Sequence, residues 1–149
     1  MNFKQIFNQE PEIKESANAR VNIIGEHTDY TGGYVMPTLL NFNTEIELSS
    51  NNEKNYHIYS KHYEEKKIFN DFIKSSDNNW ADYIKGCLFV FHDENKKIPI
   101  TYLNILISSS IPMERGISSS SALCVAILKA LNIYFKTQYS EKHIAVLAQ

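Results

Sequence analysis

The sequence predicts an α+β fold with helices packed on one face of a sheet. Strand-like stretches come first along the chain and apolar helix-like stretches follow, an order typical of this class. The most informative stretch is residues 108–131, where a buried strand leads through a Gly/Ser turn into a helix of small apolar residues. The 149 residues, 43% of them hydrophobic, are enough for one domain with a core.

Local patterns predict the individual elements. A short amphipathic helix and a polar connection are expected within residues 3–16, and a helix with a cap-rich start at residues 80–93. Hydrophobic alternation and buried apolar runs predict strands at residues 17–24, 34–40, 44–50, 56–60, 66–72 and 101–109. The polar turn at residues 51–55 favours a hairpin between the two strands beside it.

Composition excludes several classes of protein. The net charge of −2 argues against a nucleic-acid binder or a protein of the membrane surface. No apolar run is long enough to span a membrane, and the N-terminus lacks the pattern of a secretory signal. The two cysteines, Cys87 and Cys124, lie in apolar surroundings and are expected to be reduced and buried. We therefore expect a cytoplasmic protein.

The last predicted helix begins at Ser140 and is still apolar at Ala148, next to the final residue, Gln149. It has no capping residue, glycine or polar tail at its end. This pattern leads us to expect that the 149 residues are the N-terminal domain of a longer protein, truncated after Gln149.

The Gly/Ser loop at residues 112–122 precedes the central apolar helix. The first N–H groups of a helix have no partner within it, and serines add hydroxyl donors, so this arrangement favours a phosphate. The loop is neither a Walker A loop nor a G-x-G-x-x-G motif. The alternative is an ordinary serine N-cap on a core helix.

A second polar loop, residues 25–33, holds Glu26, His27 and Asp29 between glycines. Short carboxylates beside hydroxyl groups suit the binding of several sugar hydroxyls. Arg20, on the strand before the loop, is placed to contact a phosphate. The alternatives are a structural His–Asp pair and a surface arginine, and the spacing does not fit a calcium loop.

Three motifs resemble the galactokinase family. The string ARVNIIGEHTDYTGGYVMP at residues 19–37 is similar to its signature G-R-V-N-L-I-G-E-H-x-D-Y. Residues 112–122 resemble the superfamily phosphate-binding motif P-x-x-x-G-L-S-S-S-A, shared with homoserine, mevalonate and phosphomevalonate kinases (the GHMP kinases). Residues 80–86 look like the W-x-x-Y-x-K-G helix of galactokinases.

The resemblance implies a fold and an activity. The fold is the ribosomal-protein-S5-domain-2-like N-terminal lobe of a GHMP kinase, with a mixed sheet, and the second lobe and the catalytic aspartate lie beyond Gln149. The activity is transfer of the ATP γ-phosphoryl group to the anomeric hydroxyl of galactose. The resemblance thus implies ATP and Mg²⁺ as cofactors and galactose as substrate, and a monomer is expected. The 149 residues alone are expected to be a weak or inactive enzyme.

The resemblance also implies roles for individual residues. Arg20 is the catalytic candidate, stabilising the transferring phosphoryl group and lowering the pKa of the attacking hydroxyl. Ser120 is the expected Mg²⁺ ligand. The sugar-binding candidates are Glu26, His27, Asp29, Gly32 and Tyr34, and the nucleotide-binding candidates are Gly116, Ile117, Ser118, Ser119 and Ser120.

Two departures from the family pattern keep alternatives open. Glu114 stands where galactokinases usually carry an extra glycine, and Ser121 stands at the family's alanine position. They bear on nucleotide affinity and on the choice of sugar. A galactokinase-like sugar sensor with little catalysis, and a kinase for galacturonate or arabinose, are therefore alternatives to a galactokinase.

Overall fold

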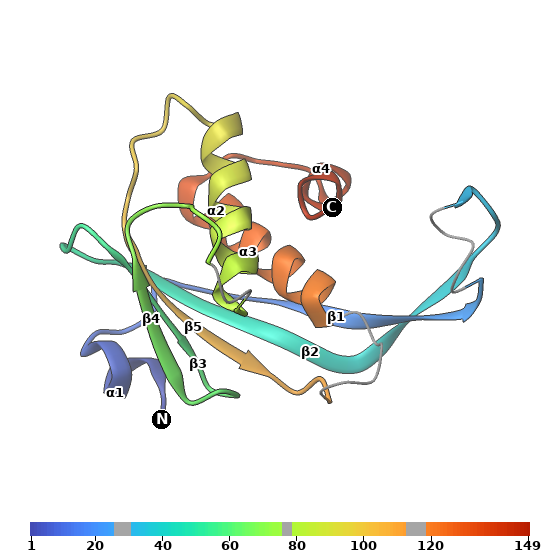
Figure 1. The fold of residues 1–149 in the computed structure, drawn as a ribbon, viewed down its shortest axis with the longest axis horizontal. Helices are drawn as coiled ribbons and strands as arrows, with labels where there is room; N and C mark the ends of the chain where they lie inside the picture. The colour runs from blue at the N-terminus through green and yellow to red at the C-terminus, as the bar shows by residue number, and fades with distance from the viewer. Residues whose placement is uncertain (26–30, 76–78, 113–118) are drawn as a thin grey trace.

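A five-stranded sheet forms the centre of the computed structural model, which describes residues 1–25, 31–75, 79–112 and 119–149 (Figure 1). The order of the strands across the sheet is β1-β2-β5-β3-β4. Their bounds are β1 Ile13–Ile24, β2 Met36–Ser50, β3 Tyr56–Ser60, β4 Glu65–Phe69 and β5 Leu103–Ser109. The pair β3–β5 is parallel and the other three pairs are antiparallel. The sheet is therefore mixed, as the family resemblance implied.

The hairpin predicted between residues 44–50 and 56–60 is wrong, because β5 lies between these two strands. Ile105 of β5 is in register with Leu48 of β2 on one side and with Ile58 of β3 on the other. The first five residues of β5, Leu103–Ile107, are buried, and such a strand is most stable at the centre of a sheet. The short polar turn at residues 51–55 carries no information on this distant partner.

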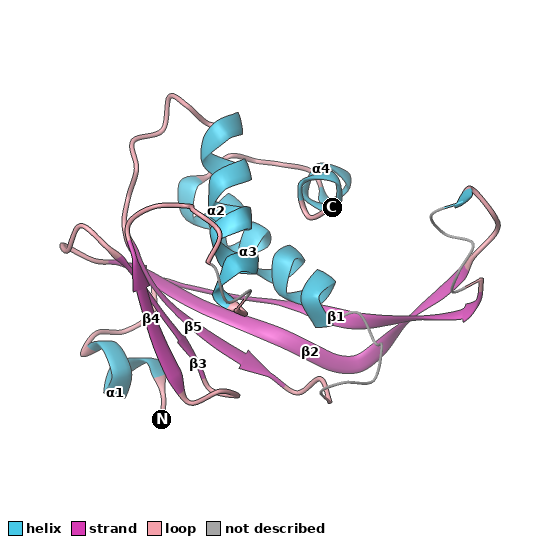
Figure 2. Ribbon diagram, viewed as in Figure 1, coloured by secondary structure: helices cyan, strands magenta, loops and turns pink. Residues whose placement is uncertain are grey.

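Helices α2 (Ala81–Glu94), α3 (Ser119–Phe135) and α4 (Glu141–Leu147) cover one face of the sheet, as predicted (Figure 2). The short helix α1 (Phe3–Phe7) lies on the opposite face. Along β5 the side chains alternate between the two faces. Ile105 packs in the main core beneath the helices, whereas its neighbour Leu106 packs with Phe3 and Tyr59 on the side of α1.

Two strands are longer than their local patterns predict. Strand β1 begins at Ile13, not at Ala17, because Ile13 continues the antiparallel ladder opposite Leu48. The predicted strands at 34–40 and 44–50 are one strand, β2. Pro37, the second residue of β2, does not break it, and proline is tolerated near the start of a strand.

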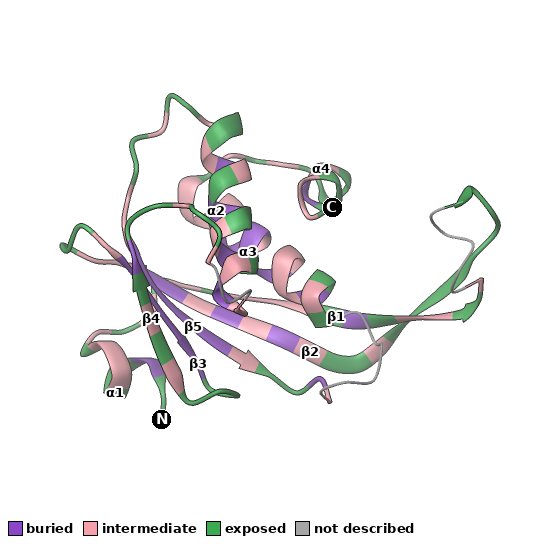
Figure 3. Ribbon diagram, in the orientation of Figure 1, coloured by how far each residue is buried: buried purple, intermediate pink, exposed green. Residues whose placement is uncertain are grey.

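The distal ends of β1 and β2 extend beyond the helices as a two-stranded arm (Figure 3). Apolar side chains on this arm are exposed, including Leu39 at 70% and Ile24 at 65%. The same two strands become buried where α3 crosses them, at Ala19 and Ile46. Within the described parts of the chain, no helix has the length and apolar character needed to cross a membrane.

Candidate active site

The first turn of α3 packs directly on β1. Ala19, Ile111 and Ala122 form a small buried cluster, with Leu40 against it. Because alanine side chains are small, the backbones of the strand and the helix come close together here. Arg20 follows Ala19 on β1, is exposed, and lines a cavity together with Ser121 and Ala122 of the first turn of α3.

A cavity of about 510 Å³ lies between β1 and α3, and we call it the Arg20 cavity. Arg20 and Leu39 contribute from the sheet, and Ser121 and Ala122 contribute from the first turn of the helix. The remaining lining residues are Ser16, Ala17, Asn18, Val125, Lys129, Asn132, Ile133, Tyr139, Glu141 and Ile144. Arg20 is therefore the sequence-predicted candidate that shares a cavity with the helix terminus.

Lys129 is a second cation in the Arg20 cavity, and the sequence analysis missed it. Its Nζ atom donates to the backbone oxygen of Ser16 at 2.8 Å and pairs with Glu15 Oε2 at 3.0 Å. These contacts hold α3 to β1 and engage much of the lysine's charge. The available signal was that Lys129 is the one charged residue of α3.

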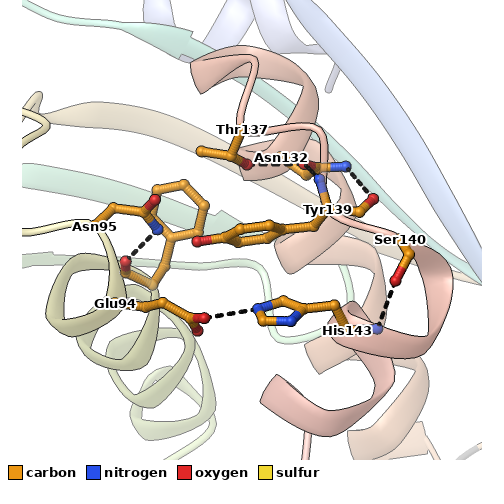
Figure 4. Close-up of polar contacts among 8 residues, drawn as sticks. Glu94, Asn95, Asn132, Thr137, Tyr139, Ser140 and His143 are labelled. Atoms are coloured by element: carbon orange, nitrogen blue, oxygen red, sulfur yellow. Dashed lines mark hydrogen bonds and ion pairs between the residues drawn. The ribbon is translucent and has the colours of Figure 1, made fainter.

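Hydrogen bonds around Asn132 fix the outer wall of the cavity (Figure 4). The Asn132 side-chain oxygen accepts from the Thr137 hydroxyl and from the Tyr139 backbone N–H, each at 2.8 Å. Ser140 caps α4 as predicted, accepting from the His143 N–H at 3.2 Å. His143 Nε2 lies 2.8 Å from Glu94 Oε1, which ties α4 to the end of α2.

A second cavity, of about 230 Å³, lies on the other side of the α3 terminus, and we call it the aromatic pocket. The rings of Tyr63 and Trp80 stack with centroids 5.8 Å apart and planes 9° apart. Trp80 Nε1 donates to Glu65 at 3.0 Å, which fixes the indole. The lining residues are Thr44, Ser60, His62, Tyr63, Trp80, Tyr83, Ile107, Ser109, Ile111, Ser119, Ser120 and Leu123.

The W-x-x-Y-x-K-G helix supplies Trp80 and Tyr83 to this pocket, whereas its lysine has a structural contact. Lys85 Nζ donates to the Ile73 oxygen at 2.9 Å and to the Ser75 hydroxyl at 3.2 Å. Asp82 accepts from the Ser75 backbone N–H at 2.9 Å, and this hydrogen bond lowers the pKa of the Asp82 carboxyl. Both contacts hold the segment before α2 in place.

Farther along α2, His92 is partly buried among aromatic rings, including Phe72 and Phe135. Its Nε2 lies 3.0 Å from the hydroxyl of the fully buried Tyr56. Burial lowers the pKa of His92 and raises the pKa of Tyr56 well above its ordinary value. The pair is a neutral contact inside the core and does not reach either cavity.

The first turn of α3 therefore separates two cavities of different character. Ser119 and Ser120 face the aromatic pocket, and Ser121 and Ala122 face the Arg20 cavity. Backbone N–H groups at a helix start and serine hydroxyls bind anions, and a planar ring stacks on the face of an aromatic side chain. The arrangement suits a ligand with a flat ring at one end and phosphates at the helix terminus.

The other predicted site residues fall into two groups. Gly32 and Tyr34 lie toward the end of the arm, outside the lining of both cavities, and Tyr34 is fully exposed. The remainder, Glu26, His27, Asp29, Gly116, Ile117 and Ser118, lie outside the described residues. The parts of the chain that the structure describes contain no cluster of three or more His, Cys, Asp or Glu side chains that could hold a metal ion.

Comparisons with known proteins agree with this architecture. Residues 1–50 match the galactokinase galactose-binding signature, and residues 82–149 match the N-terminal domain of the GHMP kinases. A galactokinase of Haemophilus influenzae (strain PittGG) is 37% identical over 134 residues, an overlap of 86% of this chain and 35% of that protein.

Residues 1–50 therefore resemble the galactose-binding signature of galactokinases, and residues 82–149 resemble the N-terminal domain of the GHMP kinases. The crystal structure of Lactococcus lactis galactokinase complexed with galactose matches 99% of the chain and 39% of that protein, with a TM-score of 0.85 and 27% identity. Methanococcus jannaschii mevalonate kinase shares the fold, with a TM-score of 0.82 and 19% identity over 95% of this chain and 45% of that protein. The chain spans about a third of the length of the curated galactokinases that it matches.

Proposed function

We propose that the protein acts as a galactokinase, transferring the γ-phosphoryl group of ATP to the anomeric hydroxyl of galactose. The observation that carries the proposal is the position of the α3 terminus, with Arg20 on one side and an aromatic pocket on the other. The galactose-binding signature at residues 1–50 favours galactose over other sugars. The Lactococcus lactis relative, solved with galactose, supports the same choice.

The aromatic pocket fits the base of a nucleotide. Its volume and the stacked aromatic rings of Tyr63 and Trp80 suit a planar heterocycle, which is stabilised by stacking on an aromatic ring. The phosphates of the same nucleotide would reach the first turn of α3, where Ser119 and Ser120 offer hydroxyl groups. The donors present thus fit ATP.

A single serine hydroxyl is a sufficient protein contribution to a nucleotide-bound Mg²⁺, since this ion keeps waters and phosphate oxygens as ligands. Ser120 is the proposed ligand, because it lines the aromatic pocket at the helix start. When bound, Mg-ATP supplies the phosphoryl group and a stabilised leaving group.

Arg20 has the proposed catalytic role. Its guanidinium carries a permanent positive charge and donates in a planar fork that matches phosphate oxygens. From β1 it would stabilise the negative charge on the transferring group and lower the pKa of the sugar hydroxyl. Glu26, His27 and Asp29 would accept hydrogen bonds from sugar hydroxyls, with Gly32 and Tyr34 as further candidates.

The test is a phosphoryl-transfer assay of the full-length protein with galactose, galacturonate and arabinose as acceptors. A galactokinase forms ADP fastest with galactose and produces galactose 1-phosphate. Faster turnover on another sugar would reassign the substrate. Galactose and ATP binding without transfer would contradict the catalytic proposal and identify a sensor. Cytoplasmic location and a monomeric state remain predictions from the sequence.

A further inference from the structure

The thiols of Cys87 and Cys124 meet where α2 packs against α3. Cys87 lies on α2 and is 5% exposed, and its Sγ lies 3.9 Å from the backbone oxygen of Cys124 on α3. The two side chains are also close enough to hydrogen-bond to each other, and both are free thiols. Neither cysteine lies within the three motifs at residues 19–37, 80–86 and 112–122.

We propose that Cys87 and Cys124 form a reversible oxidation site, at which a hydroperoxide converts the thiol pair into a disulfide joining α2 to α3. The geometry carries this inference. A disulfide requires two sulfur atoms on adjacent backbone segments, and Cys87 Sγ lies 3.9 Å from the main chain of Cys124 where the two helices pack in the core.

The two cysteines differ in ways that assign each a part in the reaction. Cys124 is partly exposed, so a small oxidant reaches it first, whereas Cys87 is buried. The hydrogen bond from Cys87 lowers the pKa of the Cys124 thiol. The same hydrogen bond, together with burial, raises the pKa of Cys87. Since the thiolate is the nucleophile, Cys124 attacks the peroxide and Cys87 completes the disulfide.

The chemistry balances in two steps. The Cys124 thiolate attacks the outer peroxide oxygen, so that an S–O bond forms, the O–O bond breaks, and an alcohol (or water, from hydrogen peroxide) leaves. The Cys87 sulfur then attacks Cys124 Sγ, so that the S–S bond forms, the S–O bond breaks, and water leaves with the Cys87 proton. A thiol reductant restores both cysteines by exchange.

Closing this disulfide affects the aromatic pocket. Tyr83 lies one helical turn before Cys87, and Ser120 lies one turn before Cys124, and both line the pocket. The sulfur atoms of a disulfide are about 2.05 Å apart, closer than non-bonded sulfurs, so α2 and α3 move together beneath the pocket. Trp80, the one tryptophan of the sequence, lines the same pocket and reports the movement.

The test exposes the purified protein to hydrogen peroxide and identifies disulfide-linked peptides by mass spectrometry. The expected product is one Cys87–Cys124 linked peptide, loss of both thiols, and a change in Trp80 fluorescence that dithiothreitol reverses. None of these readouts depends on catalysis or on nucleotide binding. A negative result would therefore contradict the disulfide proposal without bearing on the proposed kinase activity.

Two matched variants assign the roles. In Cys87→Ala, Cys124 is expected to stop at the sulfenic acid, which dimedone traps, and Trp80 fluorescence is expected to stay unchanged. In Cys124→Ala, Cys87 is expected to remain a thiol, because burial shields it. Wild-type protein that keeps both thiols, or that forms no Cys87–Cys124 peptide, would overturn the proposal. So would Cys87 oxidation in Cys124→Ala at the wild-type rate.

Discussion

The two cavities beside the first turn of α3 differ in size, charge and aromatic content. The Arg20 cavity, at about 510 Å³, is the larger and contains two cationic side chains, whereas the aromatic pocket, at about 230 Å³, is walled by stacked rings. One helix terminus serves both, through Ser119 and Ser120 on one side and Ser121 on the other. The comparison indicates that charge stabilisation and recognition of the nucleotide base involve two different cavities, which form one site because they share the α3 terminus.

The largest effect that this division predicts comes from Arg20→Ala. Loss of a transition-state arginine lowers turnover by roughly a thousandfold. Nucleotide affinity is expected to stay within about twofold of wild type, because Arg20 does not line the aromatic pocket. Steady-state kinetics of the full-length protein and direct ADP titration measure the two quantities.

Lys14→Met is the matched control for Arg20→Ala. Lys14 is another exposed cation of β1, paired with Glu45 and Glu47 away from both cavities. Its loss is expected to leave turnover unchanged. An equal loss of turnover in the two variants would mean that Arg20 acts only through the general positive charge of β1. That result would contradict the assignment of phosphoryl stabilisation to the Arg20 cavity.

A smaller effect is predicted for Tyr83→Ala in the aromatic pocket. Tyr83 is 51% exposed, so its removal leaves the core intact. Stacking of a base on an aromatic side chain contributes about 1–3 kcal/mol, so ADP affinity is expected to fall by roughly tenfold. Calorimetric titration with ADP and with galactose is the measurement, and galactose affinity is expected to be unchanged.

Phe89→Ala is the control for Tyr83→Ala, since Phe89 is an equally exposed aromatic residue on α2, at 54%, but does not line the pocket. ADP affinity is expected to be that of wild type. A loss of galactose affinity in Tyr83→Ala, with ADP affinity intact, would reverse our assignment of the two cavities.

The smallest effect concerns the scaffold that both cavities share. Burial lowers the pKa of His92 below its ordinary value of 6.5, so the unfolded state binds more protons at acidic pH. The stability contributed by neutral His92 is complete above about pH 6.5 and is lost as the pH falls from there through the folded-state pKa. Urea unfolding at several pH values measures this slope.

His92→Gln is expected to reduce the slope, because glutamine does not titrate and still offers a partner to the Tyr56 hydroxyl. Part of the slope is expected to persist through His57, whose pKa burial also lowers. An unchanged slope in His92→Gln would show that the contact between His92 and Tyr56 makes no contribution to the pH dependence of stability.

Local pattern was sufficient where an element depends on neighbouring residues. The serine cap of α4, the buried strand β5 and the apolar helix α3 were predicted because capping residues and apolar runs are short-range signals. Arg20 was predicted from the motif around it, and the structure brings it to the start of α3.

Features that depend on distant partners were not predictable in this way. The central position of β5 between β2 and β3 follows from pairing across more than forty residues. The aromatic pocket joins Tyr63, from the turn after β3, to Trp80 at the start of α2, and no local pattern links the two rings. Lys129 was missed because its partners, Glu15 and Ser16, lie on β1 at the other end of the chain.

The most direct test of this site with two cavities is an NMR titration of the protein with Mg-ADP, following backbone amides and the Trp80 indole. Our account predicts shifts at Ser119 and Ser120, at Tyr83 and at the indole of Trp80, with no shifts at Lys129 and Asn132. Shifts confined to Lys129, Asn132 and their neighbours, with the Trp80 indole unchanged, would contradict it.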